Sequence, residues 1–150
     1  EPHKDVEETK QILEGWIKSY ESKDFYTWAI ARKEDEGNVI GSISVPQLNQ
    51  KAGRVTVGYC LGRNWWGHKI MKEAFAELIR FFFEVEGANR VEALHDTHNV
   101  NSGKVMAACG LKKEGTLRRY GWNNQGICDE CIYGMVASDY FEGKQRWENK

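Results

Sequence analysis

Residues 61–75, LGRNWWGHKIMKEAF, join the end of an apolar run to the start of a helical pattern. The first backbone N–H groups of a helix lack partners and carry partial positive charge, so a helix start stabilises a phosphate or pyrophosphate. Two glycines let the backbone curl there and three side chains add positive charge: Gly62, Gly67, Arg63, His68 and Lys69. The stretch therefore indicates a site for a phosphorylated cofactor. A tight strand-to-helix turn with solvated basic residues is the alternative, because short glycine-containing motifs match by chance.

The elements before this stretch are predicted to be a helix and three strands. Asp5 with Glu8 is typical of a capping box, and apolar residues at helical spacing predict an amphipathic helix through about Ser22. The β-branched and aromatic runs at 25–33 and 39–45, joined by the turn EDEGN, predict an antiparallel hairpin. The run RVTVGYCL predicts a third strand over 54–61, in which Gly58 indicates a bulge or a close backbone approach.

The elements after the stretch begin with a long helix that ends at Gly87 as a C-cap. Its predicted apolar stripe comprises Ile70, Ala74, Leu78, Phe82 and Val85. The run RVEALH predicts the next strand, and strand, helix and strand at this spacing favour a parallel crossover. A short helix over 99–109, stopped by Gly110, precedes a closing hairpin around the turn NNQG, and the polar tail after Ser138 predicts no element. The fold class is thus α/β, with a mixed sheet, antiparallel at the ends and parallel in the middle, and with helices on both faces.

Length, composition and charge exclude several classes of protein. A chain of 150 residues suits one domain, so we expect residues 1–150 to form a single domain. The formal net charge of -1 argues against a nucleic-acid partner, and the longest apolar run is far short of the roughly 20 residues that cross a bilayer. Four cysteines without a signal-peptide pattern favour free thiols in the cytoplasm. We therefore expect no nucleic acid and no membrane as partners, and a homodimer stays open.

Several short motifs follow one another along the chain in a fixed order. They read as a Gly-Tyr strand end, a Trp-Gly turn, a Glu-Ala helix, Asn-x-x-Ser, and Cys-Gly-x-x-x-Glu-Gly. The residues are Gly58, Tyr59, Trp66, Gly67, Glu73, Ala74, Asn99, Ser102, Cys109, Gly110, Glu114 and Gly115, with Asp129 and Tyr133 in the last strand. This set resembles the GNAT acetyltransferase superfamily, and within it the ribosomal-protein N-terminal acetyltransferases RimJ and RimL, from about Val6 to Tyr140. The chain departs from the pattern at Lys69, where the family has a glycine, and at Leu111, where it has an aromatic residue.

The resemblance implies an acetyl-CoA-dependent N-acetyltransferase whose first strand and first helix have no counterpart ahead of Val6. It places the pyrophosphate of acetyl-CoA on residues 66–71 and the pantetheine along the end of the third strand, with backbone N–H groups near Leu61 facing the thioester oxygen. Lys69 offers its own N–H there only if its backbone stays right-handed. The cofactor-binding residues expected on this basis are Tyr59, Cys60, Leu61, Trp66, Gly67, His68, Lys69, Ile70, Met71 and Asn99.

The catalytic residues that the resemblance implies are Ser102, as proton donor to the leaving thiolate, and Asn99, which also caps the short helix. Capping alone explains both residue types equally well. Relatives in this group carry a glutamate near the position of Gly121, and none stands here, so no general base is assigned. Glu92, Glu114 and Asp129 are candidate replacements that structural ion pairs would explain more simply.

Other patterns carry less chemistry. Cys128 and Cys131 lack a second ligand pair and face opposite sides of a strand, so no metal site is expected. His95 and His98 are interpreted as solvated or hydrogen-bonded side chains, and Trp65 and Trp122 as either a groove rim or packing.

The function expected from sequence is acetyl transfer to the N-terminal amine of a protein or peptide, by direct attack in a ternary complex. Two alternatives stay open: a small-molecule acetyltransferase acting on an amino sugar, polyamine or drug, and a module that binds CoA or a peptide without turnover.

Overall fold

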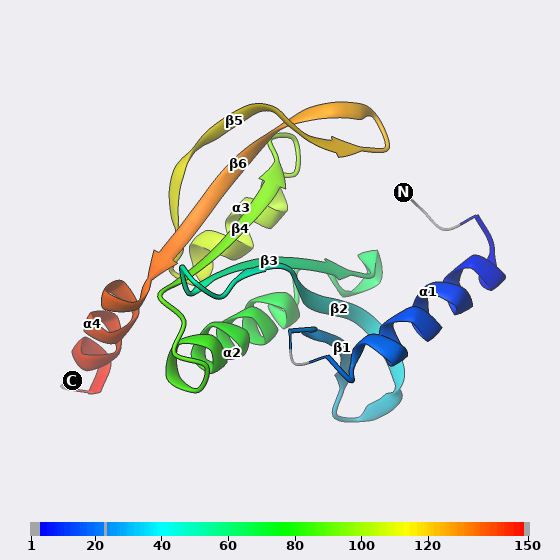
Figure 1. Ribbon diagram of the computed structural model, residues 1–150, viewed down its shortest axis with the longest axis horizontal. Helices are drawn as coiled ribbons and strands as arrows, with labels where there is room; N and C mark the ends of the chain where they lie inside the picture. The colour runs from blue at the N-terminus through cyan, green and yellow to red at the C-terminus, as the bar shows by residue number, and fades with distance from the viewer. Residues whose placement is uncertain (1–3, 23, 149–150) are drawn as a thin grey trace.

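The computed structural model describes residues 4–22 and 24–148, and its centre is one six-stranded sheet with the order β1-β2-β3-β4-β6-β5 (Figure 1). The strands are β1 Thr27–Arg32, β2 Asp35–Asn49, β3 Arg54–Leu61, β4 Arg90–Asp96, β5 Lys112–Asn123 and β6 Gly126–Val136. Neighbouring strands are antiparallel except β3 and β4, which are parallel. The predicted α/β class and mixed sheet are confirmed.

Helices lie between and beyond these strands: α1 Val6–Ser19, α2 Ile70–Glu84, α3 Val100–Ala108 and α4 Ala137–Glu148. Asp5 caps α1 as predicted, because its side chain accepts a hydrogen bond from the N–H of Glu8 at 2.8 Å. The helix ends three residues earlier than predicted, at Ser19. The hairpin turn between β1 and β2 is also tighter than predicted, since β2 begins at Asp35, within the charged run EDEGN for which the sequence predicts the turn.

The apolar stripe predicted for α2 was partly wrong. The buried residues of α2 are Met71, Phe75, Leu78, Ile79, Phe82 and Phe83. Val85 is 60% exposed, because the helix ends at Glu84, and Ile70 and Ala74 are only half-buried. At about 100° per residue, the predicted stripe is centred to one side of the buried face of α2, so Ile70, Ala74 and Val85 lie at the edge of that face.

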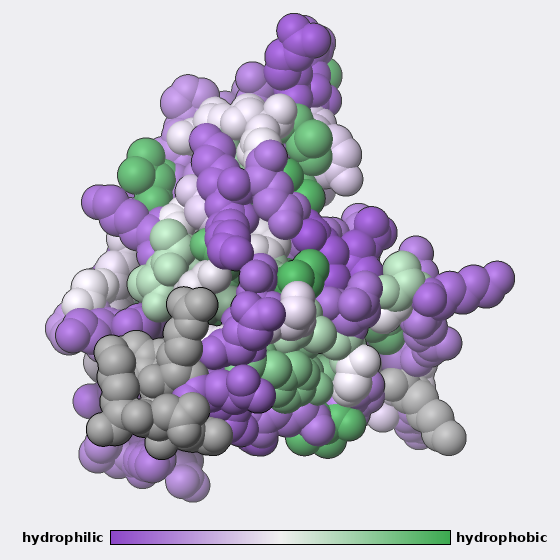
Figure 2. Space-filling view, turned by 90° about the vertical axis from the view of Figure 1, so that its left-hand side faces the viewer, coloured by the Kyte–Doolittle hydropathy of each residue, from purple (hydrophilic) through white to green (hydrophobic). Residues whose placement is uncertain are grey.

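The polar tail was predicted to hold no element, and this was wrong. α4 follows β6 directly, and the ring of Tyr140 stacks on Phe83 of α2 with the ring centroids 5.0 Å apart. Three aromatic residues, Tyr140, Phe141 and Trp147, are too few and too unevenly spaced in this polar run to show an apolar periodicity. Figure 2 shows that hydrophilic residues cover most of the face that includes the α4 side of the molecule, with hydrophobic residues in small groups. None of the helices described here is long and apolar enough to cross a bilayer.

The sheet opens at the carboxyl ends of its two parallel strands. β3 and β4 pair only from Arg54 opposite Arg90 to Val57 opposite Ala93. Beyond that point β3 runs on to Leu61 and β4 to Asp96, and Figure 1 shows the two strands diverging. The pairing of β2 with β3 is irregular between Ser44 and Gln47, next to Gly58, where the sequence predicts a bulge or close approach. Because a bulge bends a sheet and increases its twist, it helps to turn the end of β3 away from β4.

Candidate functional site

The turn between β3 and α2 keeps a left-handed backbone at two positions. Gly67 has a φ of 80°, and Lys69, the N-cap residue of α2, has φ 63° and ψ 7°. The sequence analysis expects Lys69 to offer its N–H to the diphosphate only if its backbone is right-handed. Lys69 is left-handed, so this condition is not met. Left-handed geometry is the one that glycine adopts freely, so Lys69 holds a backbone conformation that a glycine would adopt at lower cost.

The backbone N–H groups of residues 67–72 have no hydrogen-bond partner in the part of the chain that the structure describes. The first bond of this helix runs from the N–H of Glu73 to the carbonyl of Lys69 at 3.0 Å. Among the described residues no side chain caps α2, and apart from Gly67 and its two chain neighbours no atom lies within 4 Å of the place where a Cβ at Gly67 would stand. Met71 contributes only its backbone, since its side chain is buried in the core. Free donors, open space and the exposed side chains of His68 and Lys69 fit a diphosphate.

The end of β3 turns part of its backbone toward the opening. The N–H of Gly62 donates to the carbonyl of Ile40 on β2 at 2.9 Å. Hydrogen bonding alternates along an antiparallel strand, so the N–H groups of Tyr59 and Leu61 point away from β2 and toward the opening. The carbonyl of Leu61 accepts a bond from the Trp66 indole at 2.7 Å. Two amides thus face the gap in the sheet.

Tyr59 and Cys60 send their side chains to opposite faces of the sheet. The Tyr59 hydroxyl donates to the carbonyl of Ser102 at 3.0 Å, and its ring lies 5.5 Å from the ring of Phe75. Burial raises the pKa of Tyr59 well above its ordinary value, so the hydroxyl stays protonated and ties β3 to α3. Cys60 is exposed, with its Sγ 3.3 Å from the Oγ of Ser42.

Asn99 and Ser102 lie at the start of α3, beside this contact. The side-chain oxygen of Asn99 accepts from the N–H of Ser102 at 3.3 Å, which confirms the predicted cap. Ser102 is half-buried, and within the described residues its Oγ has no hydrogen-bond partner. The hydroxyl is therefore available to a ligand in the opening.

His95, which the sequence suggested to be solvated or hydrogen-bonded, is buried on β4 beneath α3. Its Nδ1 lies 2.7 Å from the carbonyl oxygen of Asp96. A carbonyl only accepts, so Nδ1 carries the proton and Nε2 is left as an acceptor. Nε2 is buried without a partner in the described chain, against the backbone of Gly103.

Gly103→Ala should destabilise the fold by about 1–2 kcal/mol. The new Cβ would stand 2.7 Å from His95 Nε2 and 3.2 Å from its Cε1. Such overpacking costs about 1–3 kcal/mol, which outweighs the gain of up to about 1 kcal/mol from replacing a helical glycine by alanine. Urea unfolding measures the loss. Gly143→Ala in α4 is the matched control, because nothing lies within 4 Å of its new Cβ and it should stabilise slightly. A stabilised Gly103→Ala protein would contradict the packing of His95 against α3.

The other residues singled out in the sequence have structural contacts. Glu92 and Glu114 both pair with Arg90, and Asp129 accepts from the backbone N–H of Arg119 at 2.7 Å, so none of the three is a free base.

The two tryptophans differ in their surroundings. The guanidinium of Arg32 lies 4.7 Å from the Trp65 ring centroid, whereas the Trp122 side chain is 69% exposed, which excludes core packing for Trp122. His98 is exposed beside Asp96. The described residues contain no group of three or more His, Cys, Asp or Glu side chains that could hold a metal ion.

A family model described as an acetyltransferase (GNAT) domain matches residues 1–112 of this chain. The chain belongs to the GNAT acetyltransferase family. It is 33% identical over 111 residues to the uncharacterized N-acetyltransferase p20 of Bacillus licheniformis, which covers 74% of this chain and 61% of that protein. It is 28% identical over 111 residues to the ribosomal protein uS5-alanine N-acetyltransferase of Escherichia coli. This match covers 73% of this chain and 57% of that protein.

The fold of this GNAT chain agrees with solved structures. The ribosomal-protein-S5-alanine acetyltransferase of Vibrio fischeri superimposes with a TM-score of 0.79 at 25% identity, over 93% of this chain and 79% of that one. The resemblance inferred from the motifs is therefore confirmed. The chain spans about three fifths of the length of the first curated relative it matches.

Proposed function

We propose that this GNAT chain transfers an acetyl group from acetyl-CoA to a primary amine, with the N-terminal amine of a protein or peptide as the favoured acceptor. One observation carries the proposal: unpartnered amides at the start of α2 stand next to an opening between β3 and β4. Relatives named for acetylating a ribosomal-protein alanine support the choice of acceptor.

Acetyl-CoA would supply an acetyl group held as a reactive thioester. The amides of residues 67–68 and 70–72 would bind its diphosphate, and the side chains of Arg63, His68 and Lys69 would add positive charge. The N–H groups of Tyr59 and Leu61 are fixed by the sheet, so they can stabilise negative charge on a carbonyl oxygen without rearrangement. Ser102 Oγ, free of protein partners among the described residues, can give a proton to a leaving sulfur.

An α-amino group suits this machinery chemically. Its pKa near 8 leaves a useful neutral fraction at neutral pH, so attack needs only modest help from a base. Lysine side chains and polyamines have amine pKa values about two units higher than that of an α-amino group, so they need more help from a base to become neutral.

The test is thiol release from acetyl-CoA with a panel of acceptors. Peptides beginning with alanine or serine should give the fastest release, with acetylation found on the α-amine by mass spectrometry. Release with spermidine or an amino sugar but not with peptides would favour the small-molecule alternative. Saturable CoA binding without release across the panel would favour a binding module and overturn the proposal.

Ser102→Ala should lower kcat by about 10- to 100-fold and leave the Kd for CoA within about twofold, because proton transfer contributes mainly in the transition state. Steady-state kinetics and calorimetry measure the two effects. Asn101→Ala, one residue earlier and exposed, is the control and should change neither. Equal losses in turnover and CoA affinity would mean that Ser102 acts only through the structure of α3.

A further inference from the structure

The carboxylate of Glu130 lies in a notch left by Gly121. A Cβ added at Gly121 would stand 2.2 Å from Glu130 Oε1 and 2.6 Å from its carboxyl carbon. Glu130 belongs to β6 and Gly121 to the neighbouring β5, so one strand supplies the carboxylate and the other supplies the space. Any side chain at residue 121 would displace this carboxylate.

An irregularity in β5 creates this arrangement. Leu117 pairs with Glu130 and Gly121 pairs with Cys128, so residues 118–120 stand opposite Asp129 alone. Arg119 adopts φ 54° within this bulge, and its N–H donates to the Asp129 side chain at 2.7 Å. Bulges of this kind re-aim side chains, and here the bulge brings the bare Gly121 alongside Glu130.

Glu130 lies beside the opening of the sheet. It pairs with Asp96, three residues beyond Ala93, the last residue of β4 that pairs with β3. Alternation along β6 puts Glu130 on the face opposite to Cys131, whose partner His95 lies under α3. An amine can therefore reach the opening from the Glu130 face while α2 and α3 cover the other.

Glu130 differs from the neighbouring carboxylates Asp96 and Asp129, which both accept hydrogen bonds from described residues. Asp96 accepts from the N–H of His98 at 2.8 Å and from the side chain of Asn123, and Asp129 is held by the bulge. Glu130 is half-buried and makes no hydrogen bond or ion pair within the described residues. A carboxylate that no protein group neutralises is free to accept a proton from a ligand.

We propose that Glu130 is the general base of the acetyl transfer and that Gly121 serves it by leaving room for its carboxylate. The inference rests on the proposed function. As the amine nitrogen bonds to the acetyl carbon and the carbon–sulfur bond breaks, the nitrogen gives one proton to Glu130. The sulfur takes a proton by way of Ser102, which regains it from solvent, and Glu130 returns its proton to solvent.

Glu130→Gln should lower kcat by about 100-fold with the acceptor peptide, while the Kd for CoA stays within about twofold. The glutamine keeps the shape of the side chain, so the fold should be unaffected. Glu77→Gln, an exposed carboxylate paired with Arg80 on α2, is the control and should keep full turnover. Full turnover in Glu130→Gln would overturn the proposal while leaving the proposed function standing. A wild-type protein that releases no thiol would overturn both.

Moving the carboxylate across the hairpin gives a second test. Glu130→Ala empties the notch, and Gly121→Asp in that background returns a carboxylate to the same space from β5. The double variant should regain at least tenfold in kcat over Glu130→Ala alone. A double variant no faster than Glu130→Ala, while folded and able to bind CoA, would contradict the assignment of a base to this notch.

Cys128 gives a readout that does not depend on activity. Burial raises the pKa of the Cys128 thiol, and the charges of Asp96 and Glu130 raise it further. Glu130→Gln should therefore lower this pKa and speed alkylation of Cys128 at a fixed pH, as followed by peptide mapping. An unchanged rate would mean that the Glu130 carboxylate does not lie on this face of the sheet.

Discussion

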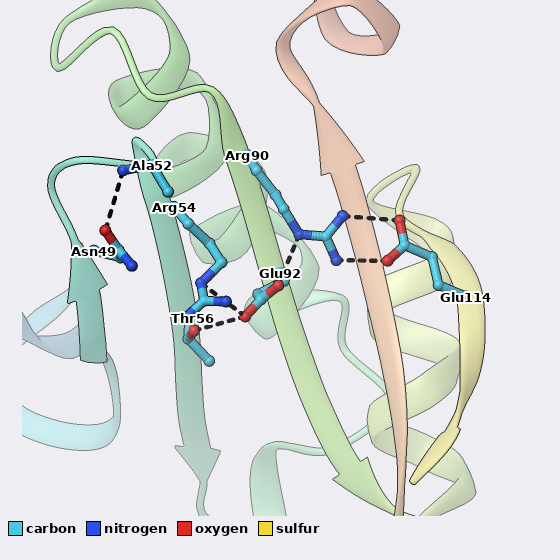
Figure 3. Close-up of polar contacts among 7 residues, drawn as sticks. All are labelled: Asn49, Ala52, Arg54, Thr56, Arg90, Glu92 and Glu114. Atoms are coloured by element: carbon cyan, nitrogen blue, oxygen red, sulfur yellow. Dashed lines mark hydrogen bonds and ion pairs between the residues drawn. The ribbon is translucent and has the colours of Figure 1, made fainter.

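Replacing Glu92 with alanine should lower the free energy of unfolding by about 3–5 kcal/mol. Glu92 is buried on β4, where Arg90 Nε donates to its Oε2 at 2.7 Å and Thr56 Oγ1 donates to its Oε1 at 2.9 Å. Arg54 Nε lies 3.6 Å from the same Oε1. Figure 3 shows Arg54 and Thr56 reaching Glu92 from the adjacent strand β3, and Arg90 reaching it from the same strand β4. Removing one partner of a buried ion pair costs about 3–5 kcal/mol, because the remaining charge is left uncompensated.

The control for Glu92 is its neighbour in the same network. The two carboxylate oxygens of Glu114 accept hydrogen bonds from the two terminal nitrogens of Arg90, at 2.9 and 2.5 Å. This pair lies over Gly134, which has no side chain to block it. The bonds from Arg90 hold the pKa of Glu114 below its ordinary value. The Glu114 side chain is 42% exposed, so Glu114→Ala should cost only about 1 kcal/mol or less. Urea unfolding of both variants, followed by circular dichroism, measures the contrast. Similar losses in the two variants would show that burial of Glu92 is not what sets its contribution.

Local signals in the sequence were enough to predict the elements that frame the site. The β-branched run at 54–61 gave β3 with its observed bounds, and Asn99 and Gly110 mark both ends of α3. Each of these signals acts within a few residues. The parallel pairing of β3 with β4 also followed, because one helix between two strands favours a parallel pair.

Contacts between distant segments could not be read in the same way. α4 is held by the stacking of Tyr140 on Phe83, residues far apart in the chain. The sequence has no carboxylate at residue 121, which is a glycine, whereas the structure places the carboxylate of Glu130, from the adjacent strand, in the space beside it. The signal that could have found it is a glycine and a glutamate on opposite strands of one predicted hairpin. A bulge between them hides their proximity, because it changes the register that a regular hairpin would have.

Gly67→Val should weaken CoA binding by about tenfold to a hundredfold. Valine's branched methyl groups would project into the open space above the amides at the start of α2, where no described residue other than the two chain neighbours has an atom within 4 Å of the new Cβ. A hydrogen bond to a charged group contributes about 1.5–3 kcal/mol, and 1.4 kcal/mol is a tenfold change in affinity, so losing one such bond gives this range. Isothermal calorimetry with CoA measures it.

The substitution also strains the backbone, since Gly67 has a φ of 80°. Gly87→Val separates the two effects. Gly87 lies just beyond the other end of α2 with a φ of 66°, and nothing lies within 4 Å of its new Cβ. Both variants should lose about 1–3 kcal/mol of stability from left-handed strain, but only Gly67→Val should lose affinity for CoA. If both bind CoA as tightly as the wild type, the diphosphate does not rest on the amides of this turn. If both lose affinity equally, strain in the fold, and not the blocked amides, accounts for the effect.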